Sequence, residues 1–144
     1  MVKRGEHFKL HFTFTIPRAI QKQADLYFLS VDPFKLLGSM NWLVKESRKY
    51  PIEFPYPYSV KKEISVNYPA ARFVLRSLPI GGSFIDEDFQ YRSSFSSTAP
   101  GSVAATEMFA VKNPVIGAQK YPAVKKFFDK IKSASSEKLI LTDK

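Results

Sequence analysis

Two stretches of the 144-residue chain alternate apolar and polar side chains, and each stretch ends at a proline. In residues 8–16 and again in residues 60–68, the apolar side chains recur at every second position. A period of two buries one side of an extended chain and leaves the other side in water, so both stretches predict β-strands. Pro17 and Pro69 cannot donate a hydrogen bond to a neighbouring strand, and we expect them to end the strands.

The other β signals are shorter. Lys62 is the one polar residue in the inward-facing series of residues 60–68. Three prolines within residues 51–57 exclude a helix and favour an extended or edge-strand path. The Gly81-Gly82 pair can supply the positive φ of a tight turn. Further strands are expected at residues 25–31, 73–75, 103–111 and 139–141, with turns near residues 86–88 and 98–102.

One helix is expected over residues 122–132, directly before the last strand. Pro122 suits the first helical turn, where its missing N–H costs little. Seven to nine strands and one late helix predict a mainly β fold, an antiparallel β-sandwich that is immunoglobulin-like or related. The apolar residues of the helix form one stripe, and the lysines lie off it. The stripe consists of Val124, Phe127, Phe128 and Ile131.

We expect a single domain over residues 1–144, because a chain of this length fits one compact core. Residues 1–47 are expected to supply leading strands and an irregular connection, and residues 48–144 the domain proper. The absence of cysteine excludes disulfides and thiolate chemistry. No stretch has the pattern of a signal peptide or the apolar length of a membrane span. The chain is therefore expected to be cytoplasmic or a piece of a longer protein.

The formal net charge is +9, which raises the question of a nucleic-acid partner. The surplus of lysine and arginine lies in residues 1–62 and 118–144, and no arginine-rich stripe is present. Such a diffuse charge is more typical of solubility, or of attraction to an anionic cell envelope, than of a specific groove. We expect no nucleic-acid partner.

The sequence offers little for catalysis or metal binding. His7 and His11 lie about 13 Å apart if they share a strand, so they cannot hold one metal ion together. Residues 86–88 are three acids in a row, which we interpret as a solvated hairpin tip. Residues 81–83 lack the lysine and the helix of a phosphate-binding loop. The serines of residues 93–97 lack the context of a nucleophile. We predict no catalytic, cofactor-binding or metal site, and no enzyme activity.

One set of residues has binding character, namely aromatic side chains on or near the proline-rich stretch. Such rings form a rigid platform that can stack on a sugar or dock a neighbouring domain. The alternative is that they cover the edge of the core or strengthen the seam of the sandwich. The candidate platform consists of Trp42, Tyr50, Tyr56 and Tyr58.

Residues 48–59 resemble the entry of the C-terminal β domain of bacterial transglutaminase-like proteins. The helix pattern of residues 121–131 and the strand pattern of residues 139–141 are similar to the end of that domain. The intervening order of strand, hairpins and helix also matches, and residues 31–37 look like the segment that leads into the domain. The resemblance thus spans nearly all of the chain.

In that family, a β domain without an assigned function follows a papain-like transglutaminase core in exported proteins. The resemblance implies a non-catalytic accessory domain that packs on or positions such a core, in cis or in trans, in the periplasm or cell envelope. The catalytic Cys-His-Asp set of the core has no counterpart here. The alternative is a module that binds an envelope glycan, a peptide or an anionic polymer. Neither hypothesis needs a cofactor or membrane insertion.

Overall fold

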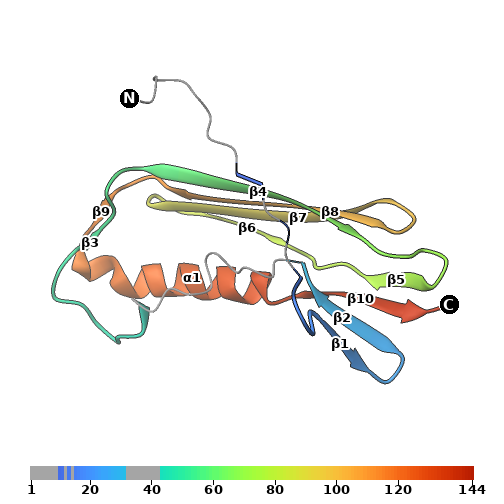
Figure 1. The fold of residues 1–144 in the computed structure, drawn as a ribbon. Helices are drawn as coiled ribbons and strands as arrows, with labels where there is room; N and C mark the ends of the chain where they lie inside the picture. The colour runs from blue at the N-terminus through green and yellow to red at the C-terminus, as the bar shows by residue number, and fades with distance from the viewer. Residues whose placement is uncertain (1–9, 12, 14, 32–42) are drawn as a thin grey trace.

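The computed structural model describes residues 10, 11, 13, 15–31 and 43–144 (Figure 1). Within these residues the chain forms strands, a short 3-10 helix and one α-helix. The strands are β1 (Ile20–Gln23), β2 (Leu26–Ser30), β3 (Ile52–Glu53), β4 (Tyr58–Asn67), β5 (Phe73–Ser77), β6 (Gly82–Ile85), β7 (Phe89–Ala99), β8 (Ser102–Val111), β9 (Val115–Ile116) and β10 (Lys138–Asp143). The helices are η2 (Ala118–Lys120) and α1 (Tyr121–Ser135).

All strand pairs are antiparallel. One four-stranded sheet has the order β4-β8-β7-β6, a second has the order β1-β2-β10-β5, and β3 and β9 form a two-stranded ribbon. The first sheet makes one layer, and α1 and the second sheet follow one another in the layer beneath it (Figure 1). The predicted mainly β sandwich with one helix before the last strand is therefore confirmed.

Alternating side chains decide which side of the long sheet is covered. On β8, Val103, Ala105, Phe109 and Val111 are buried. The inner face carries two apolar clusters: one lies between the sheet and α1, and the other lies between the sheet and β2, β5 and β10. This inner face is therefore covered along its length by α1 at one end and by the second sheet at the other.

The helix presents the predicted apolar stripe to the sheet, since all four residues of that stripe are buried. Pro122 occupies the first turn, as expected. The helix extends through Ser135, one turn beyond the prediction, and Tyr121 and Ala134 add to its buried side. The helix leads into β10, so one continuous C-terminal segment supplies part of the cover for both halves of the long sheet (Figure 1).

The predicted strand over residues 8–16 is wrong for the part of it that the structure describes. Leu10, His11, Thr13, Thr15 and Ile16 lie in no strand, and Leu10 is 66% exposed. Residues 8, 9, 12 and 14 lie outside the described residues. The alternating pattern gives the segment two unlike faces, but a strand also requires a neighbour that shares its hydrogen bonds. Among the described residues, the first strand is β1, which pairs with β2.

The Gly81-Gly82 pair lies in a connection between the two sheets and not in the tight turn that was expected. Gly81 adopts a positive φ of 79°, as the sequence indicates. The segment does not fold the chain back as a tight hairpin, because it connects β5 of one sheet to β6 of the other. The hairpin of this region lies further on, between β6 and β7.

Replacing Phe89 by alanine tests the aromatic centre of the core. Phe89 is 0% exposed, and its ring centroid lies 5.4 Å from that of Phe127 and 5.2 Å from that of Phe128. We expect Phe89→Ala to lower the free energy of unfolding by about 3–5 kcal/mol, measured by urea denaturation, because it removes a large buried ring and leaves a cavity. Ile85→Ala, at a 56% exposed position, is the control and should change stability little. Equal losses in the two variants would contradict this account of the core.

Candidate functional site

Residues 43–57 form a largely irregular segment that passes around the start of α1 and closes one end of the core (Figure 1). Ile52 belongs to the apolar cluster between α1 and the long sheet, and Leu43 and Phe54 pack against that cluster, so all three anchor the segment. The backbone is fixed as well, because Ile52 belongs to the β3–β9 ribbon and the Phe54 N–H donates to Pro114 O at 2.7 Å. The exposed side chains between these anchors are therefore held on an ordered backbone.

The helix holds the same segment through Tyr121. The buried Tyr121 hydroxyl donates to Lys45 O at 2.8 Å, and Lys125 Nζ donates to the same oxygen at 3.2 Å. The Arg48 guanidinium lies 5.8 Å from the centroid of the Tyr121 ring, within the range of a cation–π contact. Lys49 adds a further cation to the segment, which also carries the exposed Glu46 and Glu53.

The candidate aromatic platform is divided by the structure. Tyr50 and Tyr56 lie on the anchored segment and are 78% and 65% exposed. Tyr58, the first residue of β4, is half-buried and packs against the core. Trp42 lies outside the described residues. Only Tyr50 and Tyr56 are thus seen to present most of their surface to a ligand or partner.

Tyr58 connects the exposed ring of Tyr56 to the core. Its ring centroid lies 6.3 Å from that of Phe54, 6.3 Å from that of Phe109 and 6.2 Å from that of Tyr56. Burial, and then the neighbouring Tyr56 phenol, raises the pKa of Tyr58 above its usual value of 10.0. Tyr58 therefore covers the edge of the core, and Tyr56 lies beside it on the outside.

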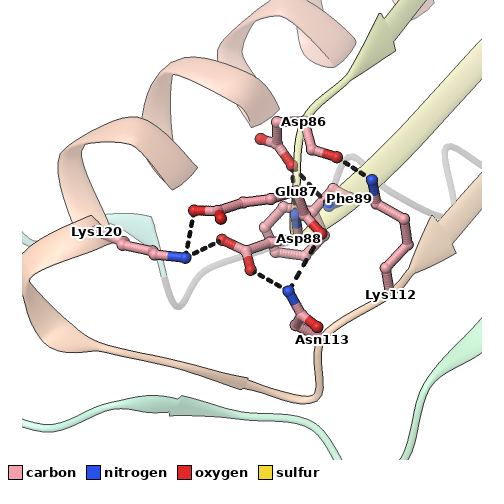
Figure 2. A network of polar contacts seen from close by, with 7 residues as sticks. All are labelled: Asp86, Glu87, Asp88, Phe89, Lys112, Asn113 and Lys120. Carbon is pink, nitrogen blue, oxygen red and sulfur yellow. Dashed lines mark hydrogen bonds and ion pairs between the residues drawn. The ribbon is translucent and has the colours of Figure 1, made fainter.

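A polar network lies at the same end of the molecule, where the β6–β7 turn meets the start of α1 (Figure 2). The Asp88 carboxylate accepts hydrogen bonds from Asn113 Nδ2 at 2.8 Å and from Lys120 Nζ at 3.2 Å. Lys120 also pairs with Glu87. Asp86 Oδ1 shapes the turn by accepting from the backbone N–H of Asp88 at 2.9 Å. The network ties the β6–β7 turn to the β8–β9 connection at Asn113 and to η2 at Lys120.

This network corrects the interpretation of residues 86–88 as a solvated hairpin tip. The acids do form the turn between β6 and β7, but Asp88 is only 5% exposed. A buried carboxylate is tolerated when cations and N–H donors surround it, and Asn113 and Lys120 satisfy that requirement here. Asp88 is therefore a structural anchor, whereas Glu87 remains in contact with solvent.

A second polar contact, partly buried, lies between the two apolar clusters. Lys62 and Glu107 face each other across β4 and β8, and their side chains are 17% and 12% exposed. They form an ion pair, and the Tyr91 hydroxyl donates to Glu107 Oε1 at 2.8 Å. The single polar residue in the inward series of residues 60–68 thus has an acidic partner on the next strand, which the sequence analysis missed.

Comparison with family models matches residues 25–141 to the family described as a domain of unknown function with solved structure, DUF3858. The chain belongs to the DUF3858 family. No curated protein matches the sequence of this DUF3858 domain, and no solved structure matches it.

The sequence analysis also singled out two histidines and a run of serines. His11 is exposed, and His7 lies outside the described residues. The serines of residues 93–97 belong to β7. In the part of the chain that the structure describes, no three His, Cys, Asp or Glu side chains are grouped to hold a metal ion. In that same part, no helix is long and apolar enough to cross a membrane.

The Lys120 contacts predict a stability change at alkaline pH. The carboxylates of Glu87 and then Asp88 raise the pKa of Lys120 above its usual 10.5. When the pKa of a lysine is higher in the folded protein than in the unfolded chain, its contacts stabilise the fold fully at any pH below the unfolded-state pKa. That stabilisation is lost as the pH rises through the folded-state pKa. Between about pH 9 and about pH 12, the wild-type domain should therefore lose more free energy of unfolding than Lys120→Met.

The matched control for this comparison is Lys126→Met, which removes an exposed lysine of α1. Urea denaturation across the pH series measures all three proteins. The Lys126→Met profile should run parallel to the wild-type profile. A Lys120→Met profile that also runs parallel would show that the Lys120 contacts do not stabilise the fold.

Proposed function

We propose that this DUF3858 domain is a non-catalytic accessory domain that packs on, or positions, a transglutaminase-like core in the same polypeptide or in a partner chain. The observation that carries the proposal is the exposure of Tyr50 and Tyr56 on a segment whose backbone is fixed by Leu43, Ile52 and Phe54. A partner that buries rings on an ordered backbone loses little conformational entropy, which favours association.

The surface around the two tyrosines fits a protein partner. Val44 is 76% exposed, and Val115, which pairs with Glu53 in the ribbon, is 61% exposed. Burial of a large apolar side chain contributes roughly 1.5–3 kcal/mol, and tyrosine is enriched among the residues that dominate protein interfaces. These side chains lie on or beside one segment, so a single partner surface can cover several of them.

The identity of the partner rests on the resemblance of residues 48–59 and 121–141 to the β domain that follows a transglutaminase-like core. The segment that carries Tyr50 and Tyr56 lies within the stretch that carries this resemblance and inside the matched residues 25–141. The same resemblance supports a setting in the periplasm or cell envelope.

The Tyr50→Ala/Tyr56→Ala double variant tests the proposal. Binding of a bacterial transglutaminase-like core that lacks its own C-terminal β domain is measured by isothermal titration calorimetry. We expect the double variant to weaken binding by about ten- to a hundredfold, because it removes two exposed rings from the interface. Neither ring belongs to the buried core, so the variant should keep the stability of the wild-type domain.

Ile20→Ala is the control for this titration, since it removes an exposed apolar side chain from β1, in the other sheet. It should leave the affinity unchanged. Full affinity of the double variant, or failure of the wild-type domain to bind the core at all, would exclude docking through this surface.

The same segment supports a second candidate, a module that binds an envelope glycan, a peptide or an anionic polymer. The observation in its favour is that Lys45, Arg48 and Lys49 flank the exposed Tyr50. Aromatic rings beside cations suit a ligand that combines a flat face with negative charge. If soluble cell-wall fragments bind the wild-type domain and not the double variant, while the core does not bind, this second function replaces the first.

A further inference from the structure

The outer face of the β4-β8-β7-β6 sheet holds a shallow hollow of about 520 Å³. It lies on the side of the sheet opposite α1, because its strand residues alternate with those that face the core. The lining includes aliphatic side chains, hydroxyl groups and two cations. Its principal members are Lys61, Ile80, Arg92, Ser94, Thr106 and Met108.

Arg92 lies in the middle of this hollow without an acidic neighbour. The strand register places Ser83 on one side of it and Met108 on the other, and Lys61 follows Met108 in the same row. The next outward residue on β7, Ser94, is uncharged. Arg92 is exposed, and within the described residues its guanidinium forms no hydrogen bond, ion pair or ring contact. Its donors remain available to a ligand.

Lys61 differs from Arg92 because it already has a partner. Its Nζ lies 2.7 Å from Glu63 Oε1 on the same strand. This contact lowers the pKa of the Glu63 carboxyl below its usual value. Both side chains are largely exposed, so the pair adds little to the stability of the fold and mainly makes this edge of the hollow polar. Arg92 is the cation at this site whose charge is not balanced.

One wall of the hollow is an exposed aliphatic residue on a fixed backbone. Ile80 is 89% exposed, yet its N–H donates to Glu137 Oε2 at 2.5 Å. Gly82 N–H donates to Ser93 Oγ at 3.0 Å. Gly81 approaches β7 so closely that a Cβ would lie 2.5 Å from Ser93 O, and its φ is positive. The wall is therefore ordered before any ligand binds.

We propose that this hollow binds an acidic peptide segment, with one carboxylate on Arg92 and an adjacent aliphatic side chain between Ile80 and Met108. A guanidinium donates two parallel hydrogen bonds to a carboxylate, which gives both strength and orientation. Ser94 and Thr106 supply hydroxyls for the peptide backbone. A peptide is favoured over a saccharide because none of the described lining residues is aromatic, so no ring is present for a sugar to stack on.

This inference does not depend on the proposed docking surface. The hollow is formed by the middle of the long sheet and residues 80–83, whereas the docking surface is formed by residues 43–57 and β9. The Tyr50→Ala/Tyr56→Ala variant should therefore bind the peptide normally. The double tyrosine variant and the Arg92 variants together show whether binding is lost at the docking surface or at the hollow.

The test is an NMR titration of the ¹⁵N-labelled domain with the peptide acetyl-Leu-Glu-Leu-amide. We expect shifts confined to the middle of β7 and β8 and to residues 80–83. Arg92→Gln should weaken binding at least tenfold, and Arg92→Lys should weaken it less, because lysine keeps the charge but not the fork of donors. Lys126→Gln, which removes the same charge from the exposed side of α1, is the matched control and should leave the affinity unchanged.

Three results would overturn the proposal. The first is equal binding of acetyl-Leu-Gln-Leu-amide, which would show that no carboxylate is recognised. The second is unchanged binding by Arg92→Gln with the wild-type spectrum retained. The third is binding of trigalacturonate as tightly as the peptide and with the same dependence on Arg92, which would assign the hollow to an acidic saccharide.

Discussion

The inner face of the long β4-β8-β7-β6 sheet has to be shielded from water along its length, and this requirement organises the fold. Neither α1 nor the second sheet does so alone, since each covers one of the two apolar clusters. The ion pair of Lys62 and Glu107 lies in the row of residues between these clusters. Because a buried charge is costly without its partner, this pair favours one register of β4 against β8.

Much of this arrangement could be predicted from local patterns. The alternating residues of β4 and β8 and the apolar stripe of α1 report which side of each element is buried, and the structure agrees. The sequence even shows Lys62 as an inward-facing polar residue. Glu107 is likewise a polar residue at an inward-facing position in the series from Val103 to Val111. Because a cation and a carboxylate that face the core each need a partner of opposite charge, the pair could have been identified from the sequence.

The features that could not be predicted depend on contacts between distant positions. Residues 86–88 have the composition of a surface turn, and Asp88 is buried only because Asn113 and Lys120, 25 and 32 positions away, converge on it. The separation of Tyr58 from Tyr50 and Tyr56 likewise depends on Phe109 of another strand, which half-buries the first ring and not the others. A periodic pattern carries no information on such contacts.

The core-facing side chains stabilise the fold, and we propose that the exposed rings of residues 43–57 contact another domain. Hydrogen–deuterium exchange of a polypeptide that contains both a transglutaminase-like core and this domain, compared with the domain alone, tests that assignment most directly. We predict that the core slows amide exchange in residues 43–57 and at β9, and leaves β1 unchanged. Equal exchange of residues 43–57 in the two proteins would contradict the claim that this surface meets the core.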